Sequence, residues 1–155
     1  AFDQLIIERF SDLHAQANRC ELFRWRSEPR GRLAEIIVLD QFSRNMHRGD
    51  PRAFASDPLA LALAQEAVAA GADMALPEEE RGFLYMPYMH SESRAIHAIA
   101  EPLFKANAGS NTHDYEVRHK AIIDRFGRYP HRNAILGRES SEEERAFLAQ
   151  PGSSF

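Results

Sequence analysis

Cysteine is almost absent from the sequence, and its scarcity restricts the chemistry available to the protein. Cys20 is the only cysteine among 155 residues, so no internal disulfide can form and no cysteine pair can hold zinc. A chain without disulfides is typical of a reducing compartment. The sequence therefore predicts a cytoplasmic protein.

Long apolar runs and a surplus of basic residues are also missing. The longest apolar run, Leu59 to Ala64, is only six residues long, whereas a membrane-spanning helix needs roughly 18 or more. Nothing at the N-terminus has the pattern of a signal peptide. The net charge of −4 is unlike that of a general nucleic-acid-binding protein. These absences predict that the protein has no membrane or nucleic-acid partner. A length of 155 residues fits a single domain over residues 1–155.

Standard catalytic motifs are absent as well. The sequence has no HExxH, GxSxG, Walker or GxGxxG motif. The segment His90-Ser91-Glu92 matches half of the zinc-deaminase signature, but the PCxxC half is missing. The histidines are too scattered along the chain to define a metal site. We therefore expect neither a metal nor a cofactor.

Helical periodicity dominates the sequence. Apolar residues recur at spacings of three and four, and the alternating patterns typical of strands are missing. The segment Ile36 to Leu39 is apolar on every side, which predicts a buried helix over residues 31–44. Short connections favour antiparallel helical hairpins, so the predicted fold class is all-α. The other expected helices cover approximately residues 2–13, 22–28, 58–70, 78–86, 92–108, 111–126 and 141–148.

Caps and prolines suggest where these helices begin and end. Asp57-Pro58 predicts an N-cap followed by proline in the first turn, and Gly71 fits the residue after a helix end. Pro87 should end or kink one helix, and Pro102 should bend or split another. A capping box is predicted where Ser140-Ser141 precedes Glu143-Glu144.

Asp40 is the first anomaly, because it shares the apolar face of its helix with Leu33 and Ile36. A buried carboxylate needs a partner, and Arg44 lies one helical turn further on. Two interpretations stay open. One is a structural ion pair at the helix end. The other is a polar pocket floor formed by Asp40, Gln41, Arg44 and Asn45.

His119 is the second anomaly, since it falls within the apolar stripe of the helix over 111–126. A core histidine with satisfied hydrogen bonds and a ligand-binding histidine both fit this position. His119, His90 and Glu92 would form a site only if the fold brings them together.

Two arginine clusters are the third anomaly. One contains Arg44, His47 and Arg48, and the other lies in the window 125–138, which has no acidic residue. Both clusters could bind a phosphate or carboxylate through guanidinium groups. Both also begin at the C-terminal end of an expected helix, where cations cap free carbonyls. The second cluster extends into a loop over 127–139, and loops of this length are often functional. Its basic residues are Arg125, Arg128, His131, Arg132 and Arg138.

Several long segments resemble a known family. They are LDQFSRNMHRG at 39–49, FASDPLAL at 54–61, YMPYMHSE at 85–92 and FGRYPHRNAILGR at 126–138. On these segments the chain is identified as a member of the bacterial family called domain of unknown function 924. The resemblance covers nearly the whole chain, although most members have proline where this chain has Ser43.

The resemblance implies a tetratricopeptide-like fold of helical hairpins in right-handed stacking, although no strict repeat is detectable. It implies no established activity. Family members usually have an upstream aromatic-rich segment, and because the chain begins at Ala1 we expect such a segment to be missing here. The motif positions of the family correspond to Asp40, Gln41, Arg44, Asn45, Arg48, His90, Glu92, Arg128, His131, Arg132 and Asn133.

Three hypotheses follow for the function. The first is a helical-hairpin binding module whose basic, histidine-containing pocket holds a small anion or an acidic peptide of a protein partner. The second is a hydrolase that uses a histidine with Glu92 or Asp40 as acid–base partners. The third is that these residues only stabilise the fold. In the first hypothesis the charge of the ligand is held by Arg44, Arg48, Arg128 and Arg132, and hydrogen bonds are donated by Asn45 and Asn133. In the second hypothesis the histidine is His90, His119 or His131.

Overall fold

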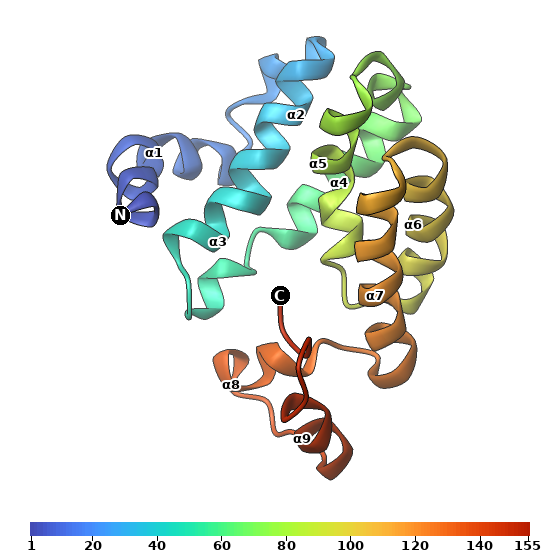
Figure 1. Cartoon of the computed structure of the whole chain (residues 1–155). Coiled ribbons are helices and arrows are strands. Elements are labelled where there is room, and N and C mark those ends of the chain that lie inside the picture. Colours follow the sequence, from blue (N-terminus) through green and yellow to red (C-terminus); the bar gives the residue numbers. More distant parts are fainter.

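The regular structure of the protein is entirely helical. The computed structural model describes residues 1–155 and contains no strand (Figure 1), which confirms the predicted all-α class. The α-helices are α1 Phe2–Asn18, α2 Pro29–Ile37, α3 Ser43–Met46, α4 Asp57–Ala69, α5 Glu78–Met89, α6 Arg94–Asn107, α7 Ser110–Phe126, α8 Asn133–Leu136 and α9 Glu142–Leu148. Short 3-10 turns are η1 Phe23–Ser27, η3 Pro51–Ala53, η4 Ala72–Ala75 and η5 Pro130–Arg132.

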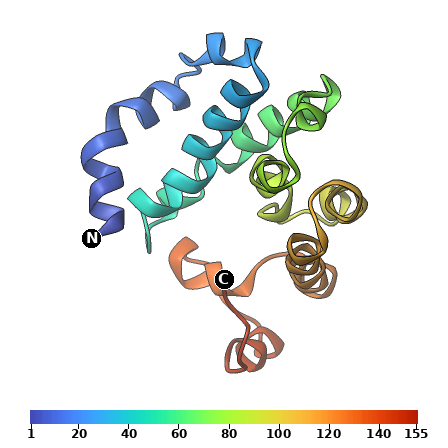
Figure 2. The same cartoon turned by 45° about the horizontal axis from the view of Figure 1, so that its top comes forward.

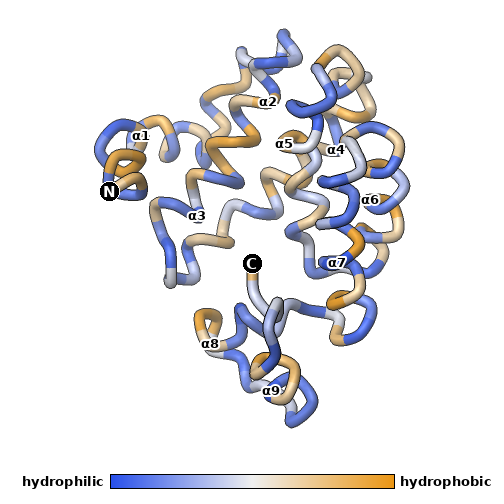
Figure 3. Tube along the Cα trace, in the orientation of Figure 1, coloured by the Kyte–Doolittle hydropathy of each residue, from blue (hydrophilic) through white to orange (hydrophobic).

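The predicted buried helix exists, but a π-helical segment interrupts it. Helix α2 continues through the π-helix η2 (Val38–Phe42) into α3 without leaving helical backbone angles. Ile36, Val38 and Leu39 are buried in it, as the apolar sequence predicts. In Figure 3 this stretch of the tube is among the more hydrophobic parts of the chain. Of the residues expected to form a pocket floor, Asp40 and Gln41 lie within the π segment, and Arg44 and Asn45 follow it in α3.

Helices α4 to α7 follow one another as packed neighbours, and this is the observed form of the helical hairpins. Helix α4 contacts α5, α5 contacts α6 and α6 contacts α7, and α2 also packs on α4 and α5. Leu84, Tyr85 and Phe104 are fully buried in the largest core cluster. Figure 2 shows the helices curving so that α7 lies opposite α3 across the C-terminal segment. Tetratricopeptide-like stacking of these hairpins stays a prediction.

Neither proline ends or splits its helix, and the predicted N-cap is not at Asp57. Helix α5 runs two residues beyond Pro87, and α6 is one continuous helix that contains Pro102. Helix α4 does begin at Asp57, but its N-cap is Ser56 and no side chain caps it. The Asp57 carboxylate binds Arg44 instead. Two local signals are confirmed: Gly71 has a left-handed backbone (φ 73°), and α9 begins with a capping box between Ser141 and Glu144.

The C-terminal segment folds back onto the middle of the molecule. After α7, η5 and α8 lead to α9, and Phe147 of α9 packs against Phe126 in a small core around Ile123 and Tyr129. The chain then returns so that its C-terminal end lies between α3 and α7 (Figure 1). The ring of Phe155 lies against that of His119.

None of the helices combines the length and the apolar character that crossing a membrane requires.

Candidate functional site

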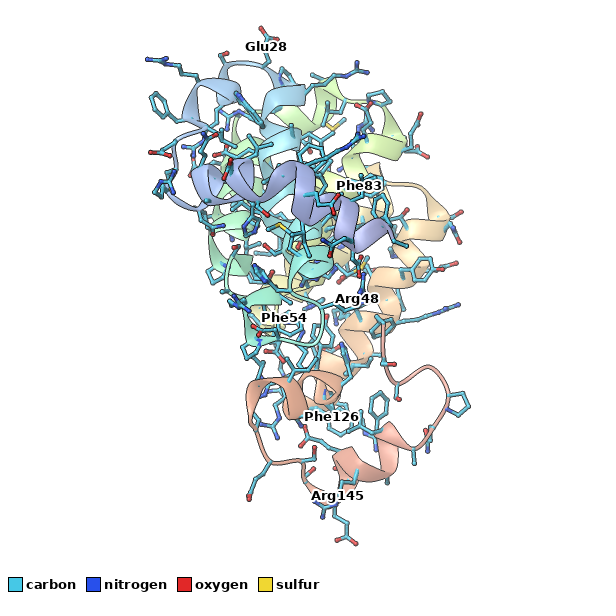
Figure 4. The ribbon with its side chains drawn as sticks, turned by 90° about the vertical axis from the view of Figure 1, so that its left-hand side faces the viewer. Glu28, Arg48, Phe54, Phe83, Phe126 and Arg145 are labelled. Atoms are coloured by element: carbon cyan, nitrogen blue, oxygen red, sulfur yellow. The ribbon has the colours of Figure 1, made fainter.

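The C-terminal end of α3, the end of α5, the middle of α7 and the segment 129–135 surround one pocket of about 350 Å³. Its charged and polar lining contains three arginines and three histidines but no aspartate or glutamate. Arg48 and Phe54, both in the lining, are labelled in Figure 4. Of the residues expected from the sequence, eight line this pocket: Gln41, Arg44, Asn45, Arg48, His90, His119, His131 and Arg132.

The remaining four expected residues lie outside the lining. Asp40 is buried behind the pocket, where it contacts His90. Glu92 accepts hydrogen bonds from Arg138 at 3.0 and 2.9 Å and from the Tyr129 amide. Arg128 forms a bidentate ion pair with Glu144, and the amide of Asn133 donates to Ser140. These contacts hold the segment 128–144 in shape.

Asp40 is the centre of a buried hydrogen-bonded group. Its Oδ1 lies 2.7 Å from Nδ1 of His90 and 3.2 Å from Nη1 of Arg44, and its Oδ2 accepts from the Gln41 amide at 2.9 Å. Burial by itself would raise the pKa of the Asp40 carboxyl, but the charges and hydrogen bonds of these partners together lower it. Asp40 is therefore ionised, and its pairing with Arg44 agrees with the ion pair expected from their spacing.

Arg44 connects two helices through two carboxylates. Besides Asp40, it binds both oxygens of Asp57 at the start of α4, at 2.9 and 3.0 Å. Only a fifth of its side chain is exposed. Bidentate pairs of this kind combine charge with fixed geometry. Arg44 thus contributes positive charge to the pocket wall while two acids behind it balance that charge.

Arg132 differs from the other pocket arginines because no carboxylate binds it closely. Its side chain is only 7% exposed, and the nearest acids, Asp57 and Glu92, are 3.8 and 3.9 Å away. Its Nη2 donates to the carbonyl of His90 at 2.9 Å, and its Nε has no hydrogen-bond partner. The guanidinium carbon lies 4.4 Å from the Phe54 ring centre and 4.8 Å from that of Tyr129. Burial, together with nearby Arg44, lowers the Arg132 pKa, so this cation is poorly compensated.

The pocket histidines His119 and His131 are neutral at pH 7. Burial lowers the pKa of both rings to about 4, and the positive charge of Arg132 adds to the effect on His131. His119 Nδ1 donates to the Tyr115 carbonyl at 2.7 Å, so its Nε2 carries the free lone pair. The Nδ1 of His131 is buried without a hydrogen-bond partner.

We expect the low pKa of His119 to make the protein less stable in mild acid. The unfolded chain takes up a proton near pH 6.5, whereas the folded ring resists protonation down to about pH 4. Stability from this group is therefore lost as the pH falls through that interval, by about 3 kcal/mol in total. In His119→Phe, urea unfolding measured at several pH values should show that much less loss between pH 6.5 and 4. Protonation of carboxylates lowers the stability of both proteins equally. The prediction would therefore be contradicted if the free energy of unfolding fell by the same amount with pH in His119→Phe and in the unmodified protein.

Sequence reasoning missed the aromatic part of the site. Tyr129, Phe54 and Phe155 line the pocket together with the predicted polar residues. Tyr129 is fully buried, and its hydroxyl donates to the Met89 carbonyl at 2.5 Å. Behind it, His97 and Glu116 form a fully buried pair at 2.8 Å. No sequence signal connects these residues, because they lie far apart along the chain and mostly outside the helices.

A second cavity of about 420 Å³ adjoins the first, and Phe54, His90 and Arg132 line both. Its wall contains Asp57 and Glu92, so it is more acidic than the first pocket. These two carboxylates already bind Arg44 and Arg138. No group of three or more histidine, cysteine, aspartate or glutamate side chains is arranged to hold a metal ion.

These features define an all-α protein with an arginine- and histidine-lined pocket between its helices. The chain belongs to the bacterial family of proteins of unknown function DUF924, whose model matches residues 1–152. It is similar to the solved structure of a protein of unknown function, ATU0120, from Agrobacterium tumefaciens. The two are 42% identical, with a TM-score of 0.91 over 96% of this chain and 84% of the other. No curated protein matches the chain.

Proposed function

We propose that the pocket binds a small anionic ligand through a carboxylate or phosphate group. The observation that carries this proposal is a lining with three arginines, three histidines and no acidic residue. Arg132 supports it most directly, because its guanidinium is buried without a close carboxylate. Arginine binds such anions through its planar set of N–H donors. A volume of about 350 Å³ suits a small molecule.

The other two arginines supply weaker attraction, because acids already contact them. Arg44 binds Asp40 and Asp57, and Arg48 binds Asp3 at 2.8 Å. Arg48 is two-thirds exposed, so its ion pair is screened by water and can exchange for a ligand. The acidic end of a peptide would offer the same anionic group. Stacked helical hairpins would support such a peptide partner by analogy of fold alone.

A pair of matched arginine variants tests the proposal. Arg48 and Arg52 are similarly exposed, at 67% and 69%, and each binds one aspartate, but only Arg48 lines the pocket. We expect Arg48→Ala to weaken binding of inorganic phosphate or citrate roughly two- to fivefold, since it removes one exposed cation. Arg52→Ala should leave the affinity unchanged. Isothermal titration calorimetry at low ionic strength measures both.

Two results would argue against an anion site. One is that neither phosphate nor citrate binds the unmodified protein, even at low salt where surface attraction is strongest. The other is that the two variants lose affinity equally, which would indicate general surface charge rather than this pocket. Arg132→Lys adds a further check, because it keeps the positive charge but loses the planar donors.

The Asp40–His90 pair supports a second candidate, a hydrolase of the acid–base type. With Nδ1 of His90 donating to buried Asp40, Nε2 is the ring nitrogen left to accept a proton. A ring oriented in this way can take the proton from a water molecule that attacks an ester or phosphoester, and can return it to the leaving group. Arg132 would stabilise the negative charge that develops on the substrate oxygen.

The hydrolase candidate predicts a large effect of His90→Gln. If p-nitrophenyl acetate or p-nitrophenyl phosphate is hydrolysed, we expect this variant to lose roughly 10²–10⁴-fold in rate, because the general base is removed. His113→Gln is the matched control, since His113 also pairs with a carboxylate, Glu101, at 2.8 Å but lies outside the pocket. Equal rates in the two variants would mean that His90 performs no acid–base step.

A further inference from the structure

An aromatic ring of the chain itself occupies part of the pocket. The ring of Phe155 stacks on that of His119 with a centroid distance of 3.8 Å and an interplanar angle of 24°. The His131 ring meets Phe155 edge-on, at 5.8 Å and 73°. Stacked and edge-to-face contacts are the arrangements that aromatic rings prefer. This part of the pocket is therefore shaped to receive a flat ring.

The walls of this ring site are held firmly in place. Tyr129 packs edge-on to His119 at 5.7 Å and lies 5.6 Å from His131, so it supports both imidazoles from behind. Its hydroxyl contacts the Met89 carbonyl and His97, which hold the Tyr129 ring in one orientation. His119 is fixed by its hydrogen bond to Tyr115. A site whose walls are already ordered loses little entropy when a ligand binds.

The chemistry of the walls also favours an aromatic ring that carries no charge of its own at the place where it stacks. His119 and His131 are neutral because burial lowers the pKa of each to about 4. A neutral imidazole presents an aromatic face without a strongly hydrated charge. The neighbouring Arg132 lies 4.8 Å from the Tyr129 ring, so the ring site and the guanidinium share a wall.

We propose that the ligand of this pocket carries its anionic group on a planar aromatic ring, and that this ring lies against His119 in the place of Phe155. This inference rests on the proposed anion site and adds the class of ligand to it. The anionic group faces Arg132, and the ring stacks on His119 and meets the ring of His131 edge-on. Phe155 competes with the ligand for the ring site. Its side chain is 56% exposed, so it leaves at small cost.

Three phosphates separate the contribution of the ring from that of the anion. We expect phenyl phosphate to bind the protein about tenfold more tightly than methyl phosphate or inorganic phosphate, since only phenyl phosphate can fill the ring site. Phe155→Ala should bind phenyl phosphate several-fold more tightly than the unmodified protein, because a competitor is gone. Its affinity for methyl phosphate should not change. Calorimetric titration gives all of these values.

His119 variants identify the stacking partner. His119→Leu should lose the advantage of phenyl over methyl phosphate, whereas His119→Phe should keep it because a flat ring remains. Circular dichroism checks that both variants are folded. Phe155 lies outside the core, so the variant Phe155→Ala tests the inference even if a His119 variant unfolds.

The outcomes distinguish failure of the ring site from failure of the anion site. If phenyl and methyl phosphate bind with equal affinity, the proposal of an aromatic ligand is wrong. If Arg48→Ala still weakens the binding of both, the proposal of an anion site is still supported. If phenyl phosphate binds Phe155→Ala more weakly than it binds the unmodified protein, Phe155 does not compete with the ligand. If neither the three phosphates nor citrate binds, both proposals fail.

Discussion

Replacing Arg44 with methionine is expected to lower the free energy of unfolding by about 3–5 kcal/mol. The substitution keeps the length of the side chain but leaves Asp40, which is 1% exposed, and Asp57 without their shared cation. Removing one partner of a buried ion pair is costly because the other charge stays buried and uncompensated. The measurement is urea unfolding followed by circular dichroism at pH 7.

Two further variants show whether the buried carboxylates cause this loss. Arg48→Met changes an exposed arginine of the same segment and should leave the unfolding midpoint nearly unchanged. Adding Asp57→Asn to Arg44→Met should recover part of the lost stability, because one uncompensated charge is removed. If Arg44→Met costs less than about 1 kcal/mol, the pairs contribute no more than surface ion pairs do.

Gly31→Ala is expected to destabilise the protein by about 3 kcal/mol or more, although alanine normally favours a helix. A Cβ atom at Gly31 would lie 1.9 Å from the carbonyl oxygen of Trp25 and 2.8 Å from its carbonyl carbon. These are backbone atoms of η1, so the contact can be relieved only by moving the start of α2. Overpacking of this kind outweighs the gain in helix propensity. Thermal unfolding measures the change.

Gly82→Ala provides the control within another helix. There the new Cβ would lie 3.4 Å from the Thr112 methyl group, which is an ordinary contact. We expect this variant to be stabilised by up to about 1 kcal/mol, as in a helix interior with free space. If both glycine variants are stabilised, η1 does not pack against α2 as closely as described.

Local signals made much of the fold predictable. The capping box at Ser141 and Glu144 and the left-handed Gly71 depend only on residues a few positions apart, so the sequence contains all the information they need. The buried helix was predictable because Ile36 to Leu39 are apolar on every side. Pro87 does not end α5 and Pro102 does not split α6, because a helix can run through a proline at the cost of one hydrogen bond. The kink or bend that the sequence offered as the alternative stays a prediction.

The candidate site was predictable in its residue types but not in its pairing. Arg44, Arg48 and Arg132 are equivalent in the sequence, yet only Arg132 lacks a close acid in the structure. The difference depends on acids far along the chain, such as Asp3, which is 45 positions from Arg48. Arg128 was expected to hold an anion, and it binds Glu144 instead. The contact of the Phe155 ring with His119 could not be predicted for the same reason, since His119 belongs to a helix far from Phe155 in the sequence.

The π-helix η2 has a consequence for how sequence changes in this family can be accommodated. One π turn in an otherwise α-helical rod accommodates a single extra residue, because the wider turn absorbs the rotation of about 100° that the residue would cause in a regular α-helix. Deleting one residue within Val38–Phe42 should therefore restore a regular rod and leave Arg44 and Asn45 facing the pocket, while Leu33 and Ile36 keep their places in the core. A one-residue alignment gap at this segment would therefore mark relatives that keep both the scaffold and the facing of these pocket residues.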